Sequence, residues 1–163
     1  KATAGKKKTK IAIVNLLGRV FLRQIVDCPF RCADVLLAEI KKQTNIIICD
    51  FHAEATSEKK SMGFYLDGRV SLVYGTHTHI PTADEQILPK KTAYLTDIGM
   101  LGPKNSIIGA TPENSIKHFL TQMPFNYEVS EDTNIEVNGI YIEIDIDNGK
   151  AILFKRIRKF VTC

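Results

Sequence analysis

Short apolar runs alternate with amphipathic segments along most of the chain. Four runs rich in branched apolar residues predict buried strands, at residues 11–15, 46–50, 70–75 and 93–97. Helical spacing of apolar residues and helix-start signals predict three helices, at residues 31–43, 57–66 and 112–122. The second helix has Thr56 or Ser57 as a candidate N-cap. This alternation of strands and helices predicts a mainly parallel sheet.

The end of the chain follows a different pattern. Residues 139–146 alternate strictly between apolar and polar, residues 147–149 (DNG) predict a turn, and residues 150–157 return. This pattern is typical of an antiparallel hairpin with one face in water. We therefore expect one α/β domain over residues 11–163, mainly parallel with antiparallel strands at one side, after a basic tail at residues 1–10.

Charge and cysteine content narrow the class of protein. The net charge is +4, and five lysines lie within residues 1–10, so the remaining 17 basic and 18 acidic residues nearly balance. A terminal lysine run is commonly a solvated tail, so charge alone gives little reason to expect nucleic-acid binding. No apolar run reaches the roughly 18 residues of a membrane span, so we expect no membrane partner. The cysteines lack zinc or redox spacing and fit a reducing cytoplasm, and they are Cys28, Cys32, Cys49 and Cys163.

Three of the four histidines follow predicted strand ends. His52 follows the second strand, and His77 and His79 follow the third within the segment GTHTH. Parallel strands end at the same edge of a sheet, where ligands of α/β proteins bind. If GTHTH is extended, its two histidines point the same way, and three imidazoles can converge on a zinc, iron, manganese or nickel ion. Carboxylates lie near in the sequence, at Asp50, Glu54, Asp84, Glu85 and Asp97.

Other interpretations of these residues remain open. His52 taken alone is more typical of an ordinary loop residue, and His118 is expected to be a surface or groove histidine. No carboxylate is an evident bridge between two metal ions. The chain has no phosphate-binding glycine motif and no nucleophile elbow, so nucleoside triphosphates, dinucleotides and serine hydrolase chemistry find no support.

Several segments together resemble a known family. They are DFHAEATSEK at 50–59, GFYLDGRVS at 63–71, GTHTH at 75–79, TADE at 82–85, PKKTAYLTDIGM at 89–100 and GPKNSIIG at 102–109. In order and spacing they resemble the YmdB-like metallophosphoesterases, bacterial calcineurin-like hydrolases described as 2′,3′-cyclic-nucleotide 2′-phosphodiesterases.

The resemblance implies a fold and a metal site. The fold is a four-layer α/β/β/α sandwich, and the site holds two divalent transition metals, iron or manganese with zinc possible. His52 and His77 resemble ligands of one ion and His79 resembles a ligand of the other. The resemblance identifies no catalytic or substrate-binding residue in this chain, although the 98–109 loop would border the substrate site. The implied substrate is a nucleotide or RNA phosphodiester.

The family's N-terminal half has no counterpart in this sequence. That half should carry an aspartate after its first strand, a bridging glutamate in G-E-N and an Asn-His pair in G-N-H. We therefore expect the C-terminal half of a sandwich, which binds metal weakly and hydrolyses poorly alone. It should associate with copies of itself or with a companion chain that carries the missing half.

Three functional hypotheses follow. The leading one is the C-terminal half of a metal-dependent phosphodiesterase. The second is a non-catalytic family member that acts as a binding or regulatory module. The third is an RNA-binding module that uses the lysine-rich start and a basic group at Lys155, Arg156, Arg158 and Lys159.

Overall fold

The computed structural model describes residues 9–124 and 126–163, which form two sheets and three helices. The larger sheet has the order β1-β2-β3-β5-β4 and is parallel except for β4. Its strands are β1 Ala12–Leu17, β2 Ile47–His52, β3 Leu72–Thr76, β4 Gln86–Ile87 and β5 Ala93–Leu95. The second sheet is antiparallel and contains β6 Leu101–Pro103, β7 Asn134–Ile144 and β8 Ala151–Thr162. The helices are α1 Pro29–Ile40, α2 Thr56–Leu66 and α3 Pro112–Thr121.

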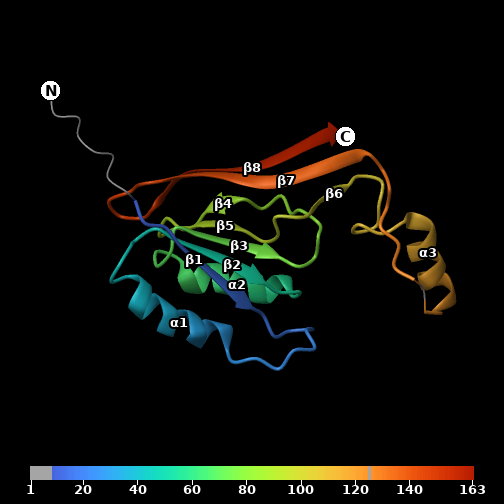
Figure 1. Ribbon diagram of the computed structural model, residues 1–163. Helices are drawn as coiled ribbons and strands as arrows, with labels where there is room; N and C mark the ends of the chain where they lie inside the picture. Colours follow the sequence, from blue (N-terminus) through green and yellow to red (C-terminus); the bar gives the residue numbers. More distant parts are fainter. Residues whose placement is uncertain (1–8, 125) are drawn as a thin grey trace.

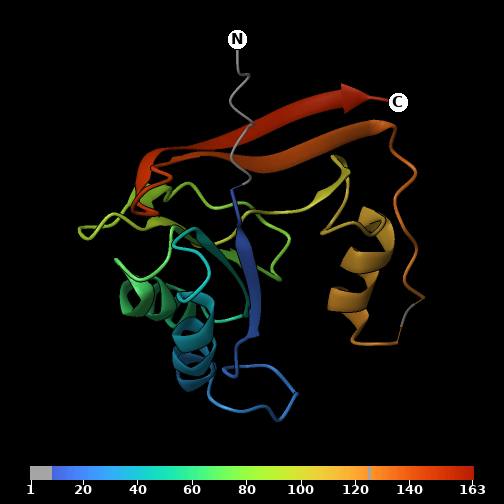
Figure 2. The same cartoon turned by 60° about the vertical axis from the view of Figure 1, so that its left-hand side comes forward.

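The elements form layers on the two faces of the larger sheet. Helices α1 and α2 cover one face, and the β7–β8 hairpin lies across the other (Figure 1). Figure 2 shows the same layers from the side, with α3 beyond the end of the larger sheet rather than over the hairpin. The chain therefore has a mixed α/β fold. No fourth layer covers the outer face of the hairpin in the part of the chain that the structure describes.

The alternation of residues along β2 explains these layers. Ile47, Cys49 and Phe51 are buried in the core beneath the helices. Ile48 packs instead in the second core, beneath the hairpin. Because side chains alternate along a strand, Asp50 and His52 lie on the same side as Ile48. The hairpin side of the sheet is thus apolar along the strand and polar at its carboxyl end.

Most predicted elements are confirmed, and the differences have local causes. The first helix begins at Pro29, which the sequence placed in a turn, because proline suits the first helical position. The predicted cap of α2 is wrong. Its N-cap is Ala55 without a side-chain bond, and Glu58 in the first turn instead accepts hydrogen bonds from the amides of Arg19 and Val20.

The predicted position of the hairpin is also wrong. The sequence placed its strands at one side of the parallel sheet, whereas β7 and β8 belong to a separate sheet. Ile140, Ile142 and Phe154 pack against Leu72 and Tyr74 on the face of the larger sheet. Burial of this apolar face is a sufficient physical reason for the arrangement. The edge position is taken by the short antiparallel strand β4.

Cysteine and membrane predictions meet different outcomes. All four cysteines are free, and burial raises the pKa of the Cys49 thiol to about 12, as expected of an inert core residue. In the part of the chain that the structure describes, no helix is both long and apolar enough to cross a membrane.

Gly75 is required by the close approach of β3 to its neighbours. A Cβ at this position would lie 1.8 Å from the carbonyl oxygen of Thr96 and 2.9 Å from Cδ of Lys59. We therefore expect Gly75→Ala to lower the free energy of unfolding by about 2–3 kcal/mol. Gly139→Ala is the matched control, because no atom lies within 4 Å of the position that its added methyl group would take. Urea unfolding that gave equal stabilities for the two variants would contradict this account.

Candidate metal centre at the carboxyl edge of the sheet

His52 and His77 meet at the carboxyl edge of the larger sheet, as the sequence predicts. His52 is the last residue of β2, and His77 follows directly after β3. Their rings form an edge-to-face pair with centroids 4.8 Å apart. Nε2 of His52 lies 3.0 Å from Nδ1 of His77. The parallel pairing of β2 and β3 brings the two residues together, because His52 is in register with Thr76.

A polar chain across three strands orients His52. The hydroxyl of Thr76 donates to Oδ1 of Asp50 at 2.8 Å, so it accepts at its oxygen from Nδ1 of His52 at 3.1 Å. The other Asp50 oxygen accepts a hydrogen bond from the side-chain amide of Asn15 on β1. This direction of donation places the proton of His52 on Nδ1. The lone pair of Nε2 therefore faces His77.

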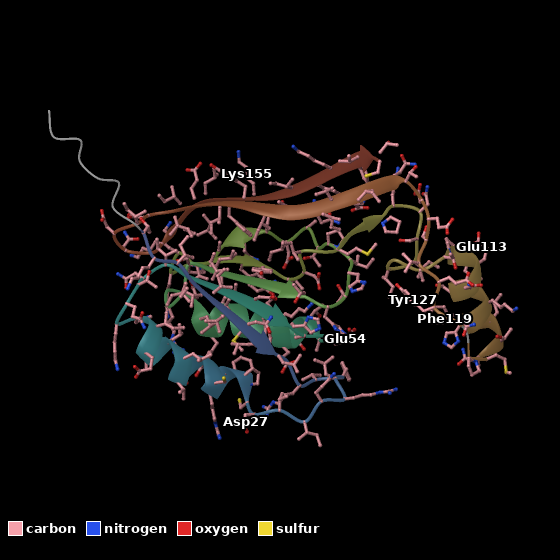
Figure 3. The ribbon with its side chains drawn as sticks, in the orientation of Figure 1. Asp27, Glu54, Glu113, Phe119, Tyr127 and Lys155 are labelled. Atoms are coloured by element: carbon pink, nitrogen blue, oxygen red, sulfur yellow. The ribbon has the colours of Figure 1, made fainter. Side chains whose placement is uncertain are left out.

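Glu54 orients His77 in the corresponding way. Its carboxylate lies 3.0 Å from Nε2 of His77, so this nitrogen carries the proton that the contact requires. Figure 3 shows Glu54 at the carboxyl edge of the sheet, beside the end of β2. The nitrogen of His77 that faces His52 is then Nδ1. Histidine ligands of metals are commonly held by such a carboxylate or hydroxyl on the second ring nitrogen.

The distance between the facing nitrogens suits a shared metal ion. With metal–nitrogen bonds of about 2.1 Å, two nitrogen ligands at right angles around one ion lie roughly 3.0 Å apart. The observed separation of Nε2 of His52 and Nδ1 of His77 is 3.0 Å. A proton between these nitrogens accounts for the same distance, and metal binding replaces such a proton. The two residues therefore fit one metal ion as a pair of neighbouring ligands.

His79 lies apart from this pair. The sequence analysis required an extended GTHTH segment to bring three imidazoles together, but His77 has a φ of 106° and His79 a φ of 66°. These left-handed conformations break the alternation of side chains. Nδ1 of His79 contacts the carbonyl oxygen of Ile108 at 3.0 Å. The structure therefore brings two histidines together rather than three, and the 98–109 loop borders the third.

Asp97 anchors the loop that carries the histidines. One of its oxygens, Oδ2, accepts hydrogen bonds from Nζ of the buried Lys59 at 2.6 Å and from the amide and hydroxyl of Thr78 at 3.2 and 2.8 Å. Its other oxygen accepts the amide of Gly99. With both oxygens engaged, Asp97 is a structural anchor, although its sequence position made it a candidate ligand. Thr78 lies between His77 and His79, so this anchor fixes the backbone on which both are carried.

The remaining donors do not complete a metal site in this chain. Among residues 9–124 and 126–163, no three histidine, cysteine, aspartate or glutamate side chains are grouped so that they could hold an ion. Asp84 is engaged by Thr96, and Glu85 lies near Arg156. Two imidazoles alone leave most coordination positions of a transition metal open.

Comparison with known proteins places the chain in a family. The family model described as YmdB-like protein matches residues 1–157. The chain belongs to the YmdB-like protein family.

Members of the YmdB-like family resemble the chain in sequence and structure. It is 50% identical over 148 residues to the 2′,3′-cyclic-nucleotide 2′-phosphodiesterase of Bacillus subtilis strain 168, covering 91% of this chain and 55% of the relative. The crystal structure of a novel phosphatase from Mycoplasma pneumoniae superposes with a TM-score of 0.83 at 42% identity, covering 91% of this chain and 52% of that one. A hypothetical protein from Thermus thermophilus gives 0.83 at 37% identity, covering 91% and 56%. The YmdB-like chain thus spans about half the length of these relatives.

Sequence reasoning missed three residues of the YmdB-like site. Thr76 connects His52 with Asp50, Lys59 holds Asp97, and Asn15 holds Asp50 from the first strand. One signal was available for the first contact. Asp50 and His52 are two residues apart on a strand, so both point to the face on which Thr76, in register with His52, also lies.

The basic residues of the hairpin divide between two faces. Lys155 and Lys159 are exposed, and Figure 3 shows Lys155 on the outer surface of the hairpin. Arg156 and Arg158 instead line a cavity with His79 on the inner face. These four residues therefore form no single basic surface. Most of the lysine-rich start lies outside the described residues, and His118 on α3 lines a separate surface cavity, as the sequence predicts.

His52 makes the stability of the YmdB-like chain sensitive to acid. Burial, and next the charge of His77, lower the pKa of His52 below its ordinary value of 6.5. As the pH falls below 6.5, the unfolded chain takes up a proton that the folded chain resists, so folding becomes less favourable. We expect His52→Gln to lose less stability than the wild type between pH 7.5 and 5.5 in urea unfolding. Equal losses in the two proteins would contradict the assignment.

Proposed function

We propose that this chain is part of a metal-dependent phosphodiesterase that hydrolyses 2′,3′-cyclic nucleotides or related phosphodiesters. The observation that carries the proposal is the 3.0 Å approach of Nε2 of His52 to Nδ1 of His77. Each ring is oriented through its other nitrogen, by Thr76 and by Glu54. The name of the Bacillus subtilis relative supports the substrate class.

In this proposal the chain's residues hold and orient the reacting groups. His52 and His77 hold one transition metal, iron or manganese with zinc as a third candidate, and His79 holds a second. When bound, such ions polarise phosphate oxygens and lower the pKa of a water nucleophile. Glu54 and Thr76 keep the metal-facing nitrogens unprotonated, and Asp97 with Lys59 fixes the loop. No residue of this chain is assigned as the general acid.

We further propose that the chain supplies the C-terminal half of the family enzyme. The relatives contain residues outside the segment that it matches, because it covers 55% of the Bacillus subtilis relative. Those residues would supply the remaining metal ligands and the general acid. The chain alone would bind metal weakly and hydrolyse slowly. A companion chain with the other half, or a second copy of this one, would complete the site.

A non-catalytic binding module of the same family is the second candidate. It is favoured by one observation, which is that only two imidazoles meet among the described residues and no larger ligand group forms. Such a module would keep one weak metal site and would gain no hydrolysis from added metal or from the other half of the enzyme.

The test is hydrolysis of adenosine 2′,3′-cyclic phosphate with Mn²⁺, followed by identification of the product. The chain is assayed alone and mixed with a polypeptide that carries the part of the Bacillus subtilis relative that it does not match. We expect the 3′-phosphate as product, a faster reaction in the mixture, and none with EDTA. A mixture that forms a complex and binds manganese without hydrolysing the substrate would support the non-catalytic module instead.

A further inference from the structure

The inner face of the β7–β8 hairpin changes character along its length. Ile140, Ile142 and Phe154 pack against the larger sheet. Further along the same face, Asn138 and Glu136 on β7 stand opposite Arg158 and Phe160 on β8 in the ladder. Figure 1 shows that this part of the hairpin extends past the carboxyl edge of the larger sheet. The hairpin therefore places polar residues over the region where the histidines lie.

A cavity lies between this part of the hairpin and the histidine loop. Its volume is ≈ 230 Å³, and its walls include His79, Met100, Lys104, Asn138, Arg156 and Arg158. His79 is shared with the candidate metal centre, so the cavity adjoins it directly. The apolar wall and a few charged groups are typical of a site for part of a small ligand.

The cavity carries more positive than negative charge. Arg158 is paired with Glu136, with nitrogen–oxygen distances of 2.8 and 3.3 Å. Nζ of Lys104 lies 4.8 Å from the ring of Phe160, and no carboxylate pairs with it among the described residues. Among the cations of the cavity, Lys104 therefore has its full charge available.

Arg156 is the second available cation. Its Nε lies 3.8 Å from Oε2 of Glu85, which is too long for a hydrogen bond, and that oxygen is buried without a hydrogen-bond partner. The guanidinium makes no hydrogen bond to any described residue, although its side chain is only 26% exposed. A half-buried guanidinium with free donors is suited to a bidentate anion such as phosphate.

We propose that this cavity binds a second phosphate of the substrate, the one on the 5′ side of the terminal nucleoside. The proposal rests on the proposed phosphodiesterase function. A cyclic mononucleotide has one phosphate, which the metal centre would take, and leaves nothing anionic for Arg156 and Lys104. A chain end of RNA that carries a 2′,3′-cyclic phosphate has a further phosphate one nucleoside away. The preferred substrate is then an oligoribonucleotide end.

The test compares two ligands that differ only in this phosphate. They are adenosine 2′,3′-cyclic phosphate and its 5′-phosphorylated form, titrated calorimetrically in EDTA so that no hydrolysis occurs. We expect the 5′-phosphate to tighten binding about tenfold in the wild type, as one charge-assisted contact does. Arg156→Ala should abolish this gain, and Arg156→Lys should keep part of it. Lys155→Ala is the matched control on the outer face and should keep all of it.

Two results would overturn the proposal, and neither depends on catalysis. One is a wild type that binds both ligands equally. The other is an equal loss in Arg156→Ala and Lys155→Ala, which would indicate general surface charge. Failure of the proposed function has a different signature, because the roughly tenfold gain in EDTA would persist while the manganese-loaded mixture of both halves left the cyclic phosphate intact. Rapid hydrolysis without any gain from the 5′-phosphate would contradict the subsite alone.

Discussion

Replacing Lys59 with methionine is expected to lower the free energy of unfolding by about 3–5 kcal/mol, because it leaves a charged partner buried. Lys59 and Asp97 are each 1% exposed, and their charged atoms lie 2.6 Å apart. Without the ammonium group, the carboxylate keeps three hydrogen bonds from Thr78 and Gly99 but loses its counter-charge. Urea unfolding monitored by circular dichroism measures the loss.

The neighbouring lysine provides the control for this variant. Lys60 is exposed on the same helix, so Lys60→Met should change stability by less than about 0.5 kcal/mol. Asp97→Asn and the double variant complete a cycle, in which the double variant should lose less than the sum of the two single losses. A loss below about 1 kcal/mol in Lys59→Met would show that the buried pair contributes little.

Replacing His77 with alanine is expected to weaken manganese binding by at least about a hundredfold. Removal of an outer partner of a ligand commonly costs roughly 10–100-fold in metal affinity, and loss of the ligand itself costs more. Hydrolysis in a reconstituted enzyme should disappear with the metal. Equilibrium dialysis followed by metal analysis measures the affinity, and unchanged turnover would contradict the role of His77.

Two further variants separate binding from positioning. Glu54→Gln keeps a hydrogen-bond acceptor for Nε2 of His77 but removes the negative charge, so we expect a smaller loss of about tenfold. His118→Ala removes an exposed histidine on α3, far along the chain from the centre, and should leave affinity unchanged. An equal loss in His118→Ala would indicate nonspecific binding by histidines.

The elements that were predicted correctly are those with a strong local pattern. The apolar run at 46–50 and the alternation at 139–146 define β2 and β7, because burial on two faces and on one face produce different periods. The strands β4 and β6 have two and three residues, which is too short for any period. The placement of the hairpin depends on contacts between sheets, so no local pattern reports it.

The site was predicted where topology determines it and missed where backbone conformation does. Parallel strand ends brought His52 and His77 together, as expected from their positions after β2 and β3. His79 departs from the expectation because of the positive φ angles of the loop, which no residue type in GTHTH dictates. Lys59 lies in a helix segment of charged residues that is typical of a solvated face, so its burial was not evident from sequence.

The most direct test of the account is the location of a metal ion in crystals of this chain soaked with Mn²⁺. The anomalous difference map should contain a peak bonded to both Nε2 of His52 and Nδ1 of His77, at about 2.0–2.3 Å from each. Glu54 and Thr76 should keep their contacts with the other ring nitrogens. A map with no peak between these two nitrogens at saturating manganese, or with His52 and His77 turned apart, would contradict the proposed metal centre.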